Sequence, residues 1–226
     1  PIFLSIWFYW DAKWFYTIAT HGYTFNQDLV VFFPLLPLVT RIFSTLFQID
    51  LAFVGLLLNS IFGLIAVIFI YKLARLDFSE KTALRSVIYF LLFPTAIFLL
   101  AFYSESLFLA LAVPSLYYAR KGSFLKATAF AIFASATRFA GVLLVLPIMI
   151  EYLESKKFNL KLLKSDFLLL SLIPTGLLSY MLYLKEKFGD PLLFVYYEKN
   201  WDREFILKKL SRPGFLTPLF TNTIKT

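Results

Sequence analysis

Hydrophobic residues run along this chain in long blocks, without the alternation of a half-buried strand. A helix that crosses a membrane needs about 20 apolar residues. Blocks that approach this length and hold at most one charge lie at residues 51–71, 86–104, 106–119, 127–150 and 167–184. The strands of a membrane barrel are only about 10 residues long and alternate in polarity. The pattern therefore predicts an all-α, polytopic helical membrane protein.

Composition supports this class and excludes others. Hydrophobic residues make up 60% of the 226 residues and charged residues only 16%, and the mean hydropathy is +0.75. A soluble domain has about 45–50% apolar and roughly 25% charged residues, and a disordered chain has still fewer apolar ones. No cysteine and one histidine exclude a disulfide scaffold and a zinc protein. The net charge of +8 comes from residues between apolar blocks, so it does not indicate nucleic-acid binding.

The lysines and arginines also predict which way the chain crosses the membrane, because short cytoplasmic loops are enriched in them. Three such loops follow residues 51–71, 106–119 and 127–150. Their basic residues are Lys72, Arg75, Lys81, Arg85, Arg120, Lys121, Lys126, Lys156, Lys157, Lys161 and Lys164. If all three loops are cytoplasmic, residues 124–153 must leave and re-enter on that side as two short helices that break at residues 137–141. Residues 30–48 then cannot cross, and we expect them to form an interfacial helix on the outer side.

This topology gives a single transmembrane domain. Residues 1–9 would be the end of a first span and 10–48 an outer loop with interfacial helices. Residues 51–184 would form the membrane helices and 185–226 a second outer loop. Because the chain begins with Pro1 and not Met, we expect it to be a fragment.

Two acidic residues of this topology are candidates for chemistry. Asp11 lies among aromatic residues at the membrane edge. A partly desolvated carboxylate there would have a raised pKa and suit a general base; alternatively, Asp11 caps a helix that starts at Ala12. Glu105 lies at the outer tip of an apolar hairpin. It is a second candidate, or a first-turn charge favoured by the helix dipole with Ser104 as the cap.

Arg138 interrupts an otherwise uncharged block of residues. An intramembrane charge indicates a functional site by default, although a structural pair with a buried carboxylate is the alternative. His21 alone is not a metal-ligand set. The topology places Asp11, Glu105 and Arg138 near the outer face, where they could line one cavity. A carboxylate base with a guanidinium, among aromatic rings, suits a substrate with an anionic phosphate and a lipid tail.

The first loop resembles a known motif, W-D-x-x-W-Y-x-x-I-A-x-x-G-Y. It belongs to the glycosylphosphatidylinositol mannosyltransferase II (PIG-V) family of integral-membrane C-type glycosyltransferases and its bacterial relatives. The matching residues are Trp10, Asp11, Trp14, Phe15, Ile18, Ala19, Gly22 and Tyr23. Phe15 stands where the family usually has Tyr. Further short matches are Phe32-Phe33-Pro34-Leu35, Phe93-Pro94-Thr95-Ala96, Tyr103-Ser104-Glu105-Ser106, Thr137-Arg138 with Gly141, and Gly189-Asp190-Pro191.

The resemblance implies a fold with membrane-parallel helices in the first outer loop. It also implies inverting transfer of a hexose, with mannose expected, from a polyprenyl- or dolichyl-phosphate donor to a glycan or glycolipid acceptor. Asp11 would be the general base, Arg138 would stabilise the departing phosphate, and Glu105 would orient hydroxyl groups. The other candidates for substrate binding are Trp10, Trp14, His21, Tyr23, Phe33, Tyr103 and Ser104.

The resemblance favours a bacterial plasma membrane over the endoplasmic reticulum. The sequence identifies no cofactor and does not decide whether a divalent metal takes part. Two other functions would fit the apolar blocks and the charge within one of them. A transporter would place its substrate site at broken helices, but no internal repeat is evident. A non-catalytic membrane scaffold would need no acid in the first loop.

Overall fold

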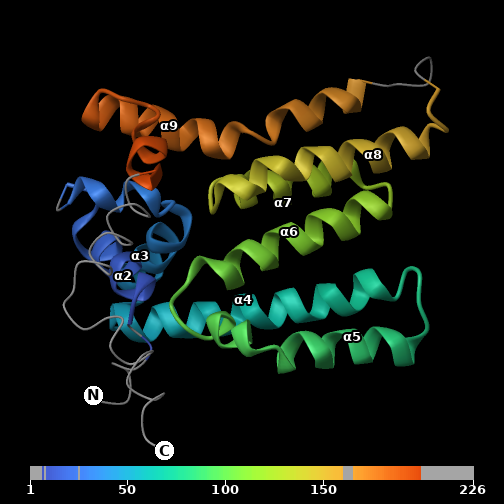
Figure 1. Cartoon of the computed structure of the whole chain (residues 1–226), viewed down its shortest axis with the longest axis horizontal. Coiled ribbons are helices and arrows are strands. Elements are labelled where there is room, and N and C mark those ends of the chain that lie inside the picture. Colours follow the sequence, from blue (N-terminus) through green and yellow to red (C-terminus); the bar gives the residue numbers. More distant parts are fainter. Residues whose placement is uncertain (1–6, 8, 25, 160–164, 200–226) are drawn as a thin grey trace, which may run out of the picture.

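The computed structural model describes residues 7, 9–24, 26–159 and 165–199 (Figure 1). This described part is helical and contains no strand, which confirms the predicted all-α class. A bundle of side-by-side helices forms one part of the molecule, and three further helices gather at one end of the bundle (Figure 1). The bundle consists of α4 (Leu51–Ala74), α5 (Glu80–Leu92), η2 (Pro94–Leu99), α6 (Ser104–Arg120), α7 (Phe124–Ser135), η3 (Phe139–Leu144), α8 (Val145–Ser155), η5 (Ser165–Leu172) and α9 (Thr175–Phe188). The group at its end consists of α2 (Asp11–His21), η1 (Gln27–Val31) and α3 (Leu35–Phe47).

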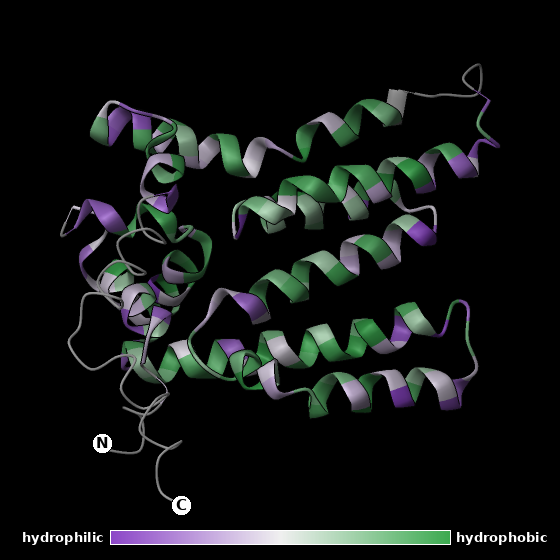
Figure 2. Cartoon of the chain, viewed as in Figure 1, coloured by the Kyte–Doolittle hydropathy of each residue, from purple (hydrophilic) through white to green (hydrophobic). Residues whose placement is uncertain are grey.

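Two helical stretches of the described chain are long and apolar enough to cross a membrane. They are Leu51–Ala74, with 24 residues, and Phe167–Phe188, with 22 residues. Hydrophobic residues predominate along the bundle helices, and hydrophilic ones are frequent at their ends (Figure 2). Pro114 lies inside α6 without ending it, as is tolerated where neighbouring helices surround the freed carbonyl.

The predicted span over residues 86–104 was wrong in its bounds. The helix α5 begins earlier, at Glu80, and ends at Leu92. Phe93 is extended, and Pro94 then begins the 3₁₀ helix η2. The cause is local, because a proline ring clashes with a helical conformation of the preceding residue. The chain therefore crosses this region as two short helices joined at Pro94.

The structure contains the predicted break at Arg138. The helix α7 ends at Ser135, and Arg138 is extended before η3 begins. Gly141 of η3 lies directly against the backbone of α7, and a Cβ atom there would collide with Ala134. The close return of η3 over α7 therefore requires glycine at this position.

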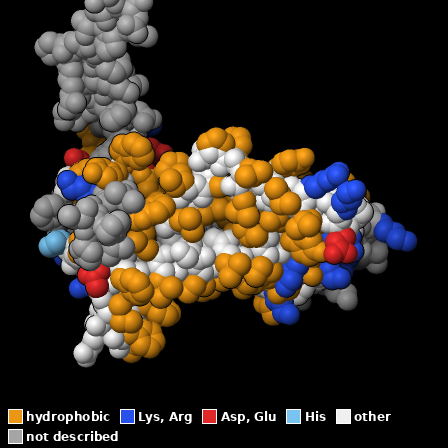
Figure 3. All heavy atoms as spheres, turned by 90° about the horizontal axis from the view of Figure 1, so that it is seen from below, with side chains coloured by type: hydrophobic (Ala, Val, Ile, Leu, Met, Phe, Trp, Pro, Cys, Tyr) orange, Lys and Arg blue, Asp and Glu red, His pale blue; other side chains and the backbone are white. Residues whose placement is uncertain are grey.

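The basic turns gather at the end of the bundle opposite α2 and α3 (Figure 1). In the space-filling view, Lys and Arg side chains cluster at that end, and hydrophobic side chains cover the middle of the face (Figure 3). Arg120 ties the helix ends together there. Its guanidinium lies 2.6 Å from Asp77 and 3.3 Å from Glu151. The assignment of this end to the cytoplasm stays a prediction.

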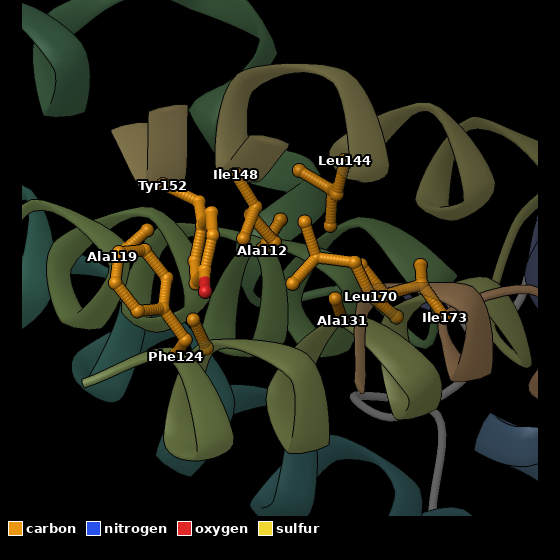
Figure 4. Close-up of a cluster of buried hydrophobic side chains, with 11 residues drawn as sticks. Ala112, Ala119, Phe124, Ala131, Leu144, Ile148, Tyr152, Leu170 and Ile173 are labelled. Atoms are coloured by element: carbon orange, nitrogen blue, oxygen red, sulfur yellow. The ribbon is translucent and has the colours of Figure 1, made fainter. Parts of the chain in front are cut away.

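Small residues allow the bundle helices to approach closely. The largest buried cluster lies between α6, α7, α8 and η5, and Ala112, Ala127, Ala131 and Ala134 form part of it (Figure 4). Small side chains at helix contacts are the usual packing device of membrane helices. Aromatic rings fill the end of this cluster, where the ring centroids of Phe124 and Tyr152 are 4.7 Å apart.

Candidate active site

Asp11 is the first residue of α2, which lies at the outer end of the bundle under the predicted topology. The residue before it, Trp10, is the N-cap residue, and α2 has no side-chain hydrogen bond at its N-cap. The alternative in which Asp11 caps a helix starting at Ala12 is therefore wrong. Trp10 has a φ of 51°, which a bulky residue rarely adopts. The start of α2 is thus held in an unusual conformation directly before the candidate base.

Tyr103, which is distant in the sequence, contacts the backbone just before α2. Its hydroxyl donates a hydrogen bond to the backbone carbonyl of Tyr9 at 3.1 Å. The backbone groups of Asp11 and Ala12 also lie close to this hydroxyl group. Sequence reasoning missed this contact, because nothing local indicates which distant residue contacts a helix start.

Glu105 and Arg138 form an ion pair. Glu105 lies in the first turn of α6, and Arg138 lies in the extended link after α7. The Nη1 atom of Arg138 is 2.6 Å from Oε1 of Glu105 and donates to Oγ of Ser104 at 3.4 Å. The two side chains are 41% and 35% exposed, so the pair is open to solvent on one side. Ser104 does not cap α6, whose N-cap residue is Tyr103.

Asp11 lies within electrostatic reach of this pair. Burial raises the pKa of Asp11, the negative charge of Glu105 raises it further, and the positive charge of Arg138 lowers it. Burial and a like charge both disfavour the ionised carboxylate. The structure thus brings Asp11, Glu105 and Arg138 together from three separate parts of the chain.

The remaining candidates separate into two groups. Trp10 is 77% exposed and adjoins Asp11. Trp14 lies one turn further along α2, with the Nζ atom of Lys13 5.5 Å from its ring centroid. Trp10 directly precedes the candidate base, and Trp14 follows it on the same short helix. Tyr103 and Ser104 directly precede Glu105, and Ser104 also contacts Arg138.

His21, Tyr23 and Phe33 lie elsewhere. His21 is at the opposite end of α2 from Asp11, where its Nδ1 atom is 2.7 Å from the hydroxyl of Thr20. Tyr23 and Phe33 are buried in a hydrophobic cluster around Tyr180. The hydroxyl of Tyr23 donates to a backbone carbonyl at 2.6 Å. The structure gives Tyr23 and Phe33 a packing role that joins the first loop to α9.

No group of three or more histidine, cysteine, aspartate or glutamate side chains that could hold a metal ion is found in the described ranges. The charged side chains of the site are two carboxylates and one guanidinium. A carboxylate with a raised pKa can accept a proton, and an arginine can hold an anionic group.

The fold and the site together define the class of this protein. It is an all-α membrane protein with two carboxylates and an arginine at one end of its helix bundle. Comparison with protein-family models then gives the particular family. The chain belongs to the mannosyltransferase (PIG-V) family, whose model matches residues 3–205. Neither the curated proteins nor the solved structures gave a match. The family supports a membrane glycosyltransferase over a transporter or a scaffold.

Proposed function

We propose that this chain transfers mannose from a polyprenyl- or dolichyl-phosphate donor to a hydroxyl group of a glycan or glycolipid, with Asp11 as the general base. The observation that carries the proposal is the position of Asp11, at the start of α2 beside the Glu105–Arg138 pair. A carboxylate whose pKa is raised is a better match to the proton of a hydroxyl group near neutral pH. The membrane is the plasma membrane of a bacterium in this proposal.

The reaction is a single inverting displacement. Asp11 takes the proton of the acceptor hydroxyl while its oxygen forms a bond to C1 of the sugar. The bond from C1 to the phosphate oxygen breaks at the same time, and the lipid phosphate leaves with the bonding electrons. The products are the glycosylated acceptor, the lipid phosphate and the protonated Asp11, which returns its proton to solvent. No further reactant is needed.

Arg138 supports the departing phosphate. Negative charge grows on the phosphate as the sugar leaves, and a fixed cation there lowers the barrier. The contacts of Arg138 in the described part of the structure go through Nη1, which leaves Nε and Nη2 of the planar fork to receive phosphate oxygens. The ion pair with Glu105 holds the guanidinium in place for this role.

Glu105 has a second oxygen for substrate. Its Oε1 atom binds Arg138, whereas its Oε2 atom is buried and has no hydrogen-bond partner among the described residues. A buried acceptor without a partner is costly, and a hydroxyl group of the sugar or of the acceptor would satisfy it. The indoles of Trp10 and Trp14 offer flat apolar faces to the sugar ring.

The interfacial helix α3 supports a donor that is embedded in a lipid layer. Its exposed residues include Leu38, Ile42 and Leu46, which are spaced four apart and so share one face of the helix. An apolar face of this kind next to polar loops is typical of a helix lying in a membrane interface. The candidate site at α2 would then open at the depth of lipid head groups, where a lipid phosphate lies.

Asp11→Asn tests the proposal. Asparagine is nearly isosteric but cannot accept the proton, and general-base contributions are about 10²–10⁴-fold. We expect transfer of radiolabelled mannose from polyprenyl-phosphate-mannose in membranes to fall by at least about 10²-fold. Donor binding and the amount of folded protein should be retained, because the Asp11 side chain does not cap α2.

Asp28→Asn is the matched control, since Asp28 is an exposed acid in the same loop. This control should transfer mannose at the wild-type rate. An active Asp11→Asn enzyme would contradict the assignment of the base, and Glu105 would become the next candidate.

A further inference from the structure

A buried amide lies behind the candidate site, in the middle of an otherwise apolar helix. Asn59 belongs to α4 and is fully buried. Its Nδ2 atom donates a hydrogen bond to the backbone carbonyl of Ala101 and a second one, at 3.0 Å, to that of Tyr103. The Asn59 amide therefore uses both of its hydrogens on one short segment that is more than 40 positions away in the sequence.

That segment, residues 101–103, links η2 to α6 and is itself buried. A second contact with α4 lies one helical turn before Asn59. Phe102 packs onto Gly55, where an added Cβ atom would lie 3.1 Å from the phenyl ring. The helix α4 thus holds the segment at two points, through an amide and through a glycine that admits the ring.

The same segment leads directly to both halves of the candidate site. At its end, the side chain of Tyr103 reaches the residues that precede α2, where its hydroxyl donates to the backbone carbonyl of Tyr9. The next two residues are Ser104 and Glu105, which hold Arg138. A movement of residues 101–103 would therefore move the base and the ion pair relative to each other.

We infer that Asn59 is a positioning residue for mannosyl transfer, acting through the backbone of residues 101–103 on Asp11 and on the Glu105–Arg138 pair. The inference rests on the proposed function. Asn59 lies in the bundle interior and acts without touching the substrate. Its effect should fall on turnover, because catalytic geometry is sensitive to displacements of about 1 Å, which can cost about 10²-fold.

The chemistry of the asparagine side chain explains why this residue serves. One planar NH₂ group offers two donors at a fixed angle, and both carbonyls need a donor in a region without water. Leucine has nearly the same shape but no donor. Aspartate has the same shape and offers a single donor when protonated, so it can satisfy only one of the two carbonyls.

The test compares Asn59→Leu and Asn59→Asp with the wild type, as full chains in membranes, with polyprenyl-phosphate-[³H]mannose as the donor. Turnover is expressed per folded molecule, counted by fluorescence-detected size exclusion. We expect Asn59→Leu to lower turnover at saturating donor by about 10–100-fold and to change the KM for the donor by less than about threefold. Asn59→Asp should lie between Asn59→Leu and the wild type.

The pH profile separates positioning from a loss of fold. A merely structural role would reduce the signal equally at every pH, in proportion to the folded fraction. Loosening residues 101–103 would instead admit water to Asp11 and weaken the burial that is the largest cause of its raised pKa. The charged groups around Asp11 are Glu105 and Arg138, with Lys13 on its own helix. The acidic limb of the Asn59→Leu profile should therefore move to lower pH.

Ser60→Ala is the matched control, because the Ser60 hydroxyl donates to the backbone carbonyl of Leu56 in its own helix, at 2.9 Å. Wild-type turnover per folded molecule in Asn59→Leu, or in Asn59→Asp if the leucine variant does not fold, would overturn the inference. Asp11→Asn in the same assay keeps the two proposals apart. An inactive Asp11→Asn with an unaffected Asn59 variant refutes positioning alone, whereas an active Asp11→Asn refutes the base.

Discussion

At the scale of single residues, Asp11 and Arg138 illustrate how a site is built from groups that each need a partner. Asp11 is half-buried beside a like charge, and Arg138 supplies the compensating cation from a link between two helices. Glu105 interacts with both of these residues. It holds Arg138 through one oxygen and raises the pKa of Asp11 through its charge.

The pH dependence of transfer should report this arrangement. A general base acts only when deprotonated, so activity is lost as the pH falls through its pKa. Burial and Glu105 raise the pKa of Asp11 above the ordinary value of 3.8, so the acidic limb of the wild-type profile should lie above that value. In Glu105→Gln, the remaining activity should show this limb at lower pH, because one of the two raising causes is gone. A limb that stays in place would contradict the coupling between the two carboxylates.

Arg138→Lys tests the need for a planar fork. An ammonium keeps the charge, but it cannot bind two phosphate oxygens side by side while also holding Glu105. Removing one donor that stabilises developing negative charge costs about 10²–10³-fold, so we expect turnover to fall by about that factor. Arg120→Lys, at the opposite end of the bundle, is the control and should transfer mannose normally. Equal turnover in Arg138→Lys and the wild type would indicate that Arg138 is a structural charge only.

At the scale of elements, η3 and α9 depend on glycines where they contact α7. Gly141 of η3 and Gly176 of α9 both lie against the C-terminal part of α7, and a Cβ atom at either would collide with its backbone. Backbone atoms cannot move aside as a side-chain tip can. These two contacts therefore fix how α7 turns back and, with it, where Arg138 lies.

Gly141→Ala should destabilise the protein and disturb Arg138, which lies only three residues earlier. Overpacking a tight contact costs about 1–3 kcal/mol, which should lower the midpoint of thermal unfolding of the detergent-solubilised protein. Turnover per folded molecule should fall as well. Ala140→Ser is the control, because it also adds one heavy atom to η3, but at an exposed position. A Gly141→Ala protein as stable as the control would show that η3 can shift away from α7.

At the scale of the whole molecule, the basic turns and the candidate site lie at opposite ends of the helix bundle. The basic turns occupy one end, and α2, α3 and the candidate site occupy the other (Figures 1 and 3). Because the positive-inside rule would place the basic turns in the cytoplasm, the site should face the outer side. The helix α3 would then lie along the outer interface without crossing.

Cysteine labelling tests this topology, since the chain has no cysteine of its own. Cysteines at positions 28 and 49 flank α3. Position 49 is preferable to 50 because Asp50 caps α4 through a hydrogen bond to the backbone of Phe53 at 3.0 Å. Both cysteines should react with an impermeant reagent added from outside to intact cells. Lys121→Cys, in a basic turn, should react only after permeabilisation, and labelling of position 28 without 49 would mean that α3 crosses.

The sequence by itself determined the class of the protein, most of its helices and the identity of its charged candidates. Apolar blocks report the membrane environment directly, because each residue of a spanning helix meets the same apolar surroundings. The break near Arg138 was also predictable, since basic loops on both sides of this block require the chain to return to the side from which it started. The predicted bounds 86–104 were wrong, because the apolar block continues through Pro94 although the helix α5 ends before it, whereas α6 continues through Pro114.

Only the tertiary structure decided which polar groups serve one another. It assigned Tyr103 to the start of α2 and Asn59 to the carbonyls of residues 101 and 103. It also showed that Trp10 is exposed whereas Tyr23 and Phe33 are buried. The sequence alone does not distinguish these three aromatic residues of the first loop. The physical reason is that helix periodicity is a local property of the chain, whereas hydrogen-bond partners and burial depend on which distant segments pack together. The candidate site is made of such distant contacts, so its residues could be proposed from the sequence but their arrangement could not.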